Sequence, residues 1–222
     1  MPTSTSQPDL WILRCRWGTI VVFFLLWIVL SINVPYPQYY VVQHLLTVLA
    51  WIVLFFMLHK RWLKEIDFYA SVLFLVLHLI GARYIYSLVP YDDWLNSIFG
   101  FTLADTFGWK RNHYDRLVHL MYGVLLTIPI WHLLERFFTR SRLSLLLLSV
   151  MVILSTSALY ELAEWILTEI AAPALAESYN GQQGDMWDPQ KDMALALGGS
   201  LITAGVLMLT PSNLKKSEST TT

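Results

Sequence analysis

The chain has 222 residues, of which 56% are hydrophobic and 14% are charged. Soluble domains carry about 25% charged residues, so this composition excludes an ordinary soluble protein and indicates a membrane protein. The formal net charge of −1 argues against a nucleic-acid-binding protein, because such proteins present a basic face to phosphates. The single cysteine, Cys15, excludes an internal disulfide.

Six apolar segments approach the length of about 20 residues that a helix needs to cross a bilayer. We place them at residues 17–34, 39–58, 66–89, 114–135, 143–170 and 190–210. The first segment follows two arginines, as in a secretory signal, but its apolar run is too long and ends without a cleavage site, so we expect a retained helix. The expected fold is an all-α polytopic membrane bundle that forms one domain, residues 1–222, with residues 211–222 as a flexible cytoplasmic tail.

The distribution of Lys and Arg predicts the orientation of the bundle, because short cytoplasmic loops retain basic residues and translocated loops lack them. With the amino terminus inside, most of the 15 basic residues fall on the inner side: Arg14, Arg16, Lys60, Arg61, Lys64, Arg136, Arg140, Arg142, Lys215 and Lys216. We therefore expect both termini in the cytoplasm. The longer loops, roughly 90–113 and 171–189, would face outward.

Ionisable side chains lie at the expected outer ends of the third and fourth segments. The rise of 1.5 Å per residue places Arg83 about 26 Å from the inner start of the third segment. Asp115 and His119 lie one turn apart at the outer start of the fourth segment, so they share one helical face.

The fifth and sixth segments repeat this pattern. Glu161 and Glu164 lie about 27 to 32 Å from the inner start of the fifth segment, near the outer surface. Asp188 and Asp192 lie on one face at the outer start of the sixth. Ionisable groups are rare in membrane segments and normally face the bundle interior or a wet pathway. We therefore expect the four segments to surround one polar cavity that opens outward.

The candidate residues of this cavity divide into three groups by their chemistry. The catalytic candidates are Asp115, His119, Glu161, Glu164 and Asp192. The candidates for binding an anionic or polar substrate are Arg83, Arg116, Lys191 and Tyr160. The candidate cofactor is a divalent metal ion, with possible ligands among Asp185, Asp188, Asp192, Glu161 and His119.

Structural roles compete with these functions at several positions. Asp188 stands immediately before a proline and is suited to capping the sixth helix. Asp185 fits an ordinary loop residue, and the two glutamates of the fifth segment fit ion pairs with Arg83 or Arg116. His78 is open to either role. The small residues of "MALALGGSLITAG" favour close helix packing.

Four blocks of sequence resemble the uncharacterised bacterial inner-membrane family typified by YjdF: "HLIGARYIYSLVPYDDW", "RNHYDRLVHLMYG", "SALYELAEW" and "QGDMWDPQKDMALALGG". The resemblance covers roughly residues 70–200. It implies a multi-pass helical protein of the inner membrane and carries no established reaction. The pattern is also faintly similar to VanZ-like membrane proteins, which share an Asp-x-x-x-His helix start, but a likeness of fold does not transfer function.

An enzyme acting on a lipid or lipid-linked substrate is the first interpretation of the polar site. Carboxylates, an imidazole and nearby cations are the materials of metal-assisted hydrolysis or group transfer. Asp188, Asp192 and Glu161 would then bind the metal, and His119, oriented by Asp115, would act as the general base. Arg83 and Arg116 would hold an anionic headgroup.

Two other classes of function compete with this interpretation. A proton-coupled transporter also uses intramembrane acids and histidines, but the chain shows no internal repeat and no matching pair of broken helices. A structural or assembly protein would leave the number of unbalanced acids unexplained. The sequence leaves open the substrate, the reaction, the metal and the oligomeric state.

Overall fold

The computed structural model describes residues 10–170 and 182–210. In these ranges six helices are long and apolar enough to cross a membrane, and they are α1 (Leu10–Leu30), α2 (Pro37–His59), α3 (Glu65–Arg83), α6 (Tyr114–Phe137), α7 (Arg142–Ile170) and α9 (Asp188–Leu209). Two short helices, α4 (Tyr91–Phe99) and α5 (Leu103–Phe107), lie between α3 and α6. The described residues contain no strand, so the prediction of an all-α bundle with six spans is confirmed. The predicted tail, 211–222, and residues 171–181 of the predicted loop lie outside the described residues.

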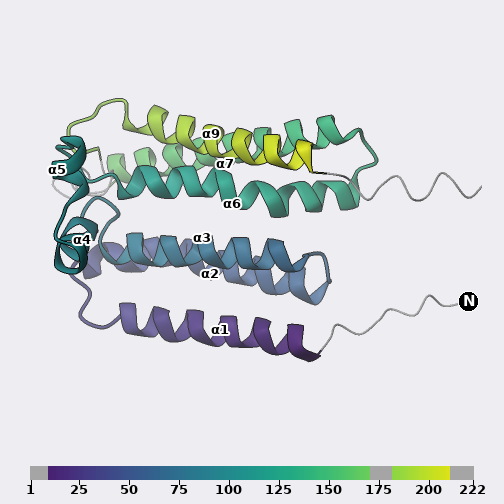
Figure 1. The fold of residues 1–222 in the computed structure, drawn as a ribbon, viewed down its shortest axis with the longest axis horizontal. Helices are drawn as coiled ribbons and strands as arrows, with labels where there is room; N and C mark the ends of the chain where they lie inside the picture. The colour runs from purple at the N-terminus through teal and green to yellow at the C-terminus, as the bar shows by residue number, and fades with distance from the viewer. Residues whose placement is uncertain (1–9, 171–181, 211–222) are drawn as a thin grey trace, which may run out of the picture.

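The long helices run side by side in two groups of three (Figure 1). One group holds α1, α2 and α3, and the other holds α6, α7 and α9, with α3 packed on α6 between them. The short helices α4 and α5 lie at one end of the bundle, which we call the α4–α5 end. The start of α1 and the end of α9 both lie at the opposite end.

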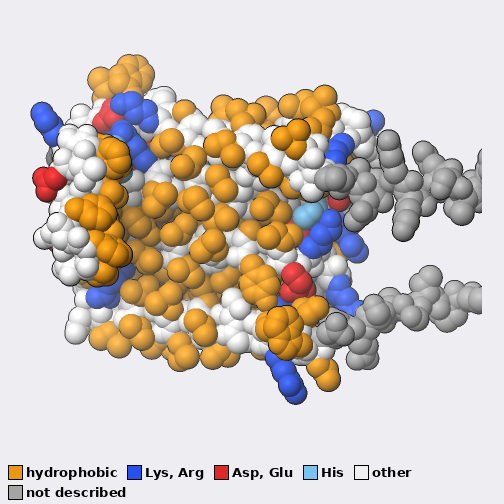
Figure 2. Space-filling model, in the orientation of Figure 1, with side chains coloured by type: hydrophobic (Ala, Val, Ile, Leu, Met, Phe, Trp, Pro, Cys, Tyr) orange, Lys and Arg blue, Asp and Glu red, His pale blue; other side chains and the backbone are white. Residues whose placement is uncertain are grey.

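On the face shown in Figure 2, hydrophobic side chains cover the middle and charged side chains gather towards the two ends. Many large apolar residues of the long helices are more than half exposed, for example Val22, Leu45 and Leu159 at 64% each. Exposed apolar surface of this extent is unfavourable in water but matches the hydrocarbon core of a bilayer. The bundle therefore has the surface of a multi-pass membrane protein.

Aromatic and aliphatic side chains form the core of the first group of helices. Phe23 of α1, Trp51 of α2 and Phe68 of α3 are almost completely buried in one cluster, and the rings of Phe23 and Trp51 lie 4.9 Å apart between centroids. A second cluster joins the groups, because Tyr86 and Val89 after α3 pack with Tyr114 and Val118 of α6.

Ion pairs tie the helices together at the end opposite to α4 and α5. Arg16 of α1 bonds to Glu65 of α3. Asp67 of α3 is completely buried and lies 2.5 Å from Nδ1 of His132 on α6. Because the partner of a buried charge offsets its desolvation, these pairs fix the order in which the helices pack.

The closest helix packing lies between α6 and α9, where glycines replace side chains. An added Cβ at Gly123 would lie 2.0 Å from the carbonyl oxygen of Ala196, and one at Gly199 would lie 2.3 Å from that of Leu120. The predicted role of the small residues in close packing is thus confirmed for Ala196 and Gly199. A Cβ added at Gly198 or Gly205 would meet no other atom within 4 Å, so these two glycines are not required for close packing.

Several helix boundaries differ from the predicted ones. α1 begins at Leu10 rather than near residue 17, because Arg16 pairs with Glu65 and is accommodated within the helix. α3 ends at Arg83 rather than near residue 89, since Ile85 and Tyr86 have φ values of 52° and 49°. α9 begins at Asp188 rather than residue 190.

Candidate functional site

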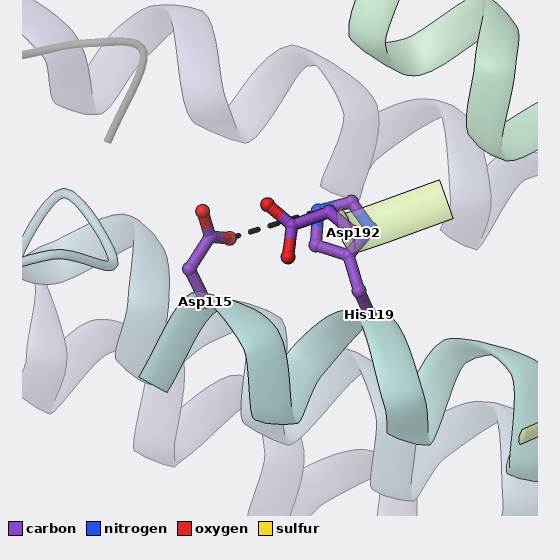
Figure 3. A group of neighbouring side chains, drawn as sticks. All are labelled: Asp115, His119 and Asp192. Carbon is purple, nitrogen blue, oxygen red and sulfur yellow. Dashed lines mark ion pairs between the residues drawn. The ribbon is translucent and has the colours of Figure 1, made fainter. Parts of the chain in front are cut away.

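Three side chains from two helices meet at the α4–α5 end of the bundle. Asp115 and His119 lie one turn apart on α6, and Asp192 of α9 faces them (Figure 3). One donor atom from each of these side chains lies within 4.8 Å of the others. The Nε2 atom of His119 is 3.7 Å from Oδ1 of Asp115, which is too long for a hydrogen bond. The group therefore surrounds a common point without its members bonding directly.

The third helix of this group, α7, adds two acids and a phenol. Oε1 of Glu161 lies 3.4 Å from Nε2 of His119, and the rings of Tyr160 and His119 are 5.9 Å apart between centroids. Glu164 lies close enough to Tyr160, Asp115 and Glu161 to interact with each of them. The predicted convergence of acids from three spans is therefore present. We call Asp115, His119, Glu161, Glu164 and Asp192 the acidic cluster.

Two carboxylate oxygens of the acidic cluster lack a hydrogen-bond partner among the described residues. Asp192 is 2% exposed and Glu161 is 8% exposed, yet Oδ1 of the former and Oε1 of the latter accept no hydrogen bond. A buried acceptor left unpaired costs about 1 to 3 kcal/mol, and more if it is charged. The cluster is thus incomplete in terms of its own side chains, and a cation would satisfy these oxygens.

A network of ion pairs lies next to the acidic cluster, at the start of α9. Arg111 forms a two-pronged hydrogen bond to Asp188, at 2.5 and 2.9 Å. Arg116 of α6 reaches Asp185 at 2.7 Å and Asp188 at 3.1 Å, and Lys191 reaches Asp185 at 2.5 Å. Three cations therefore surround two carboxylates, so the network carries an excess of positive charge beside an excess of negative charge.

The members of this network outside the spans have perturbed pKa values. The hydrogen bond from Lys191 lowers the pKa of Asp185 from 3.8 to about 2, with further help from Trp187 and Arg116. Burial is the largest single influence on Arg111 and would lower its pKa, but the hydrogen bond to Asp188 and the nearby charges of Asp188, Asp192 and Asp115 together raise it. Both groups are therefore charged at neutral pH, and Asp185 stays charged at a lower pH than an ordinary aspartate.

The structure separates several candidates that the sequence had grouped. Arg83 does not join the acids, because its guanidinium donates to the carbonyl oxygens of Leu30, Ile32 and Asn33 after α1. Of the two alternatives for Arg83, counter-ion of the acids or anion binder, the first is wrong, since these carbonyls at the end of α1 take up its donors; the second stays a prediction. Asp188 is the first residue of α9 rather than its N-cap, which is Trp187, and the Asp188 carboxylate accepts hydrogen bonds from Arg111.

The expected metal ligands also divide. Asp185 and Asp188 have cations as partners, whereas Asp192, Glu161 and His119 lie in the acidic cluster. Asp115, which the sequence suggested as the partner of His119, is instead a member of the group of possible metal ligands. The carboxylates that are free to bind a cation are thus fewer than expected.

A cavity of about 310 Å³ opens beside the acidic cluster between α2, α3, α6 and α7. Asp115 and His119 line it together with Tyr160, and Thr47 and Ser157 line it too. The hydroxyl oxygens of these last two residues are buried without a hydrogen-bond partner. The cavity therefore offers polar atoms that its own walls do not satisfy.

Sequence reasoning missed two parts of this site. Arg111 precedes α6 in the "RNHYDR" block and bonds to Asp188. These two residues are far apart in the sequence, so no local pattern predicts their contact. Tyr86 lines the cavity and bonds to Nδ1 of His78, so the open role of His78 includes a place in the cavity wall. The ring of Tyr86 packs against Gly81, where an added Cβ would lie 2.5 Å from the ring. In the sequence, only the glycine inside a predicted span indicated this close contact.

Comparisons with known proteins agree with the predicted family. The model of the predicted membrane protein family DUF2238 matches residues 15–213. The inner membrane protein YjdF of Escherichia coli (strain K12) is 35% identical over 129 residues, which cover 58% of this chain and 57% of YjdF. No solved structure matches the chain. The chain therefore belongs to the DUF2238, or YjdF-type, family of multi-pass proteins of the bacterial inner membrane.

Proposed function

We propose that this protein is a membrane-embedded enzyme that uses a divalent metal ion to hydrolyse a phosphate ester of a lipid or lipid-linked molecule. The observation that carries the proposal is the arrangement of Asp115, His119 and Asp192, whose donor atoms face one another within 4.8 Å. An ion bound at about 2.0 to 2.2 Å from each donor would hold opposite donors up to about 4.4 Å apart and neighbouring donors closer together. Binding of an ion would therefore draw the most widely spaced donors of the cluster together.

The donor set indicates the kind of ion. Carboxylate oxygens with one imidazole suit manganese, iron or zinc, whereas softer ions prefer sulfur ligands. Such an ion polarises a phosphoryl oxygen and lowers the pKa of a bound water. His119 is thus a ligand in this proposal rather than the general base that the sequence suggested.

Glu161 would act as the general base. Its Oε1 atom lies 3.4 Å from Nε2 of His119 and has no hydrogen-bond partner, so a water at the ion would lie within its reach. The water oxygen would bond to phosphorus while its proton passes to Glu161. The bond from phosphorus to the lipid oxygen would break, and that oxygen would take up the proton. An acceptor alcohol in place of water would give group transfer by the same steps.

The ion-pair network would hold the anionic headgroup. Arg111, Arg116 and Lys191 exceed their two carboxylate partners by one charge, and Lys191 is half exposed. Guanidinium and ammonium groups form strong hydrogen bonds to phosphate oxygens. A headgroup held there would have its ester close to the acidic cluster.

The site faces the outside of the cell in this proposal. Arg16, Lys64 and Arg142 bond to groups at the end opposite to α4 and α5, which is the end that the distribution of basic residues assigns to the cytoplasm. The α4–α5 end would therefore meet the outer leaflet. Lipids of that leaflet are the substrates within its reach.

The cavities favour an enzyme over a transporter. A second cavity of about 410 Å³ continues towards the opposite end, but Leu, Val, Met, Phe, Ile, Ala and Pro line it, with Ser71 as the one polar residue. Ions and protons need polar groups along their path. The polar groups that line the two cavities gather instead at the α4–α5 end, as in a site for chemistry.

Metal binding is the direct test. Purified protein in lipid nanodiscs is titrated with Mn²⁺, and the loss of the free-ion signal in electron paramagnetic resonance measures binding. We expect one ion per chain, and at least a tenfold weaker affinity in Asp192→Asn and in His119→Gln. Asp67→Asn is the matched control, because Asp67 is also a buried aspartate near a histidine, at the other end of α3 and α6.

Lipid analysis tests the reaction. Cells that express the wild type or Asp192→Asn at equal membrane levels are compared by lipid mass spectrometry, and we expect phosphate-ester lipids to accumulate in the variant. Equal Mn²⁺ affinity in wild type, Asp192→Asn and Asp67→Asn would refute the metal site. Metal binding with identical lipid profiles would refute the reaction.

A further inference from the structure

The cavity beside the acidic cluster and the second, apolar cavity adjoin each other, and we call the two together the groove. The cavity at the cluster and the apolar cavity beyond it share five lining residues, Leu46, Ala50, Phe74, Leu75 and Leu126. The groove runs between α2 and α3 on one side and α6 on the other. α7 closes the part of the groove beside the acidic cluster. It therefore starts at Asp115 and His119 and continues through the apolar interior of the bundle.

The lining of this groove changes from polar to apolar along its length. At the cluster it offers Asp115, His119 and Tyr160, with the unpaired hydroxyls of Thr47 and Ser157. Beyond Leu126 it offers Ile130 and Leu133 of α6, together with Val53, Met57 and Leu63 from the α2 side. A ligand that satisfies both ends has a polar head beside the cluster and an apolar tail.

The length of the groove fits one acyl chain. From His119 to Leu133, α6 rises about 21 Å at 1.5 Å per residue. The hydrocarbon core of a bilayer is about 30 Å thick, so the chains of one leaflet reach about 15 Å. An extended acyl chain therefore fits between the cluster and the far end of the groove.

The groove is open towards the bilayer on the side of α2. Leu46, Leu49 and Val53 line it and are also 47%, 55% and 47% exposed. α2 packs on α3, whereas α7 packs on α6 and α9, so the wall formed by α2 belongs to the other group of helices. In a membrane the medium on this side is lipid, and a chain has access without leaving the hydrocarbon.

We infer that the substrate of the proposed enzyme is a membrane phospholipid that reaches the site sideways from the bilayer and lays one acyl chain in this groove. The phosphate ester then lies beside Asp115 and His119, and the ion-pair network faces the headgroup. This inference rests on the proposed function for the reaction at the headgroup. The binding of the acyl chain depends only on the groove.

Photolabelling of the groove tests the inference. Nanodiscs contain phosphatidylglycerol with a diazirine on one acyl chain, and labelled residues are mapped by mass spectrometry after irradiation. We expect labels at Met57 and Ile130 in the groove as well as at Leu159, which faces the surrounding lipid at 64% exposure. Leu126→Trp should reduce labelling of the groove at least fivefold and leave Leu159 unchanged.

A matched variant and an independent readout make the outcome decisive. Leu117→Trp makes the same substitution on α6 at a residue that is 44% exposed and outside both linings, so it should label like the wild type. Ala50→Phe blocks the groove from α2 and should reproduce the effect of Leu126→Trp. Absence of groove labels in the wild type, or equal labels in all variants, would overturn the inference. Mn²⁺ affinity is expected to be unchanged in Leu126→Trp, so a failure of the metal site and a failure of the groove are separate results.

Discussion

Replacing Gly199 with alanine should disturb the packing of α9 on α6 and, with it, the positions of the side chains in the acidic cluster. The new Cβ would lie 2.3 Å from the carbonyl oxygen of Leu120 and 2.9 Å from the backbone nitrogen of Val124. Both are backbone atoms, so no side chain can rotate away. The two helices must separate instead.

The size of this separation follows from the contact distances. Ordinary contact begins at 3.4 Å, so the helices must move apart by about 1 Å at Gly199, and overpacking of this kind costs about 1 to 3 kcal/mol. Asp192 lies on the same helix, about two turns nearer the α4–α5 end. Metal sites tolerate errors of about 0.2 Å in ligand distances, so the shift should weaken Mn²⁺ binding at least tenfold.

Gly198 supplies the control, because it lies next to Gly199 in the same helix and has nothing within 4 Å of its added Cβ. Thermal unfolding in detergent, followed by tryptophan fluorescence, and the Mn²⁺ titration are measured for Gly198→Ala and Gly199→Ala. Only the second should lose stability and affinity. Equal behaviour of the two variants would refute the argument that backbone contact at Gly199 positions the acidic cluster.

Three further predictions concern other parts of the fold. The Lys191 hydrogen bond holds the pKa of Asp185 at about 2 instead of 3.8, so unfolding temperatures of wild type and Asp185→Asn should differ above about pH 4 and converge as the pH falls towards 2. Arg83→Gln should lower the unfolding temperature, because the carbonyl oxygens of Ile32 and Asn33 lose their hydrogen-bond donor. Its Mn²⁺ affinity should equal that of the wild type; a tenfold loss of affinity would show that Arg83 contributes to the metal site. Gly81→Ala should displace the ring of Tyr86 and cost about 1 to 3 kcal/mol in chemical unfolding, and a neutral result would contradict the packing.

Residue patterns along the chain are sufficient to predict the class of fold and to group the acids of the candidate site. Runs of apolar residues are long enough to span the bilayer, and in such runs each charge is costly enough to stand out. For this reason the acids of α6, α7 and α9 could be predicted to meet. The spacing of Asp115 and His119 also placed them on one face, since a helix repeats every 3.6 residues.

Tertiary structure alone decided which charges pair and which stay unpaired. Arg83 and Arg111 look alike in sequence, yet the first turns to the end of α1 and the second to Asp188. Asp188 and Asp192 share a helical face, but cations occupy only Asp188, while an oxygen of Asp192 is left without a partner. The helical repeat determines which residues share a face of each helix, whereas the residues that this face contacts depend on how the helices pack. One example is the backbone contact between Gly199 and Leu120. That packing arises from contacts between residues far apart in the chain, so no local pattern contains it.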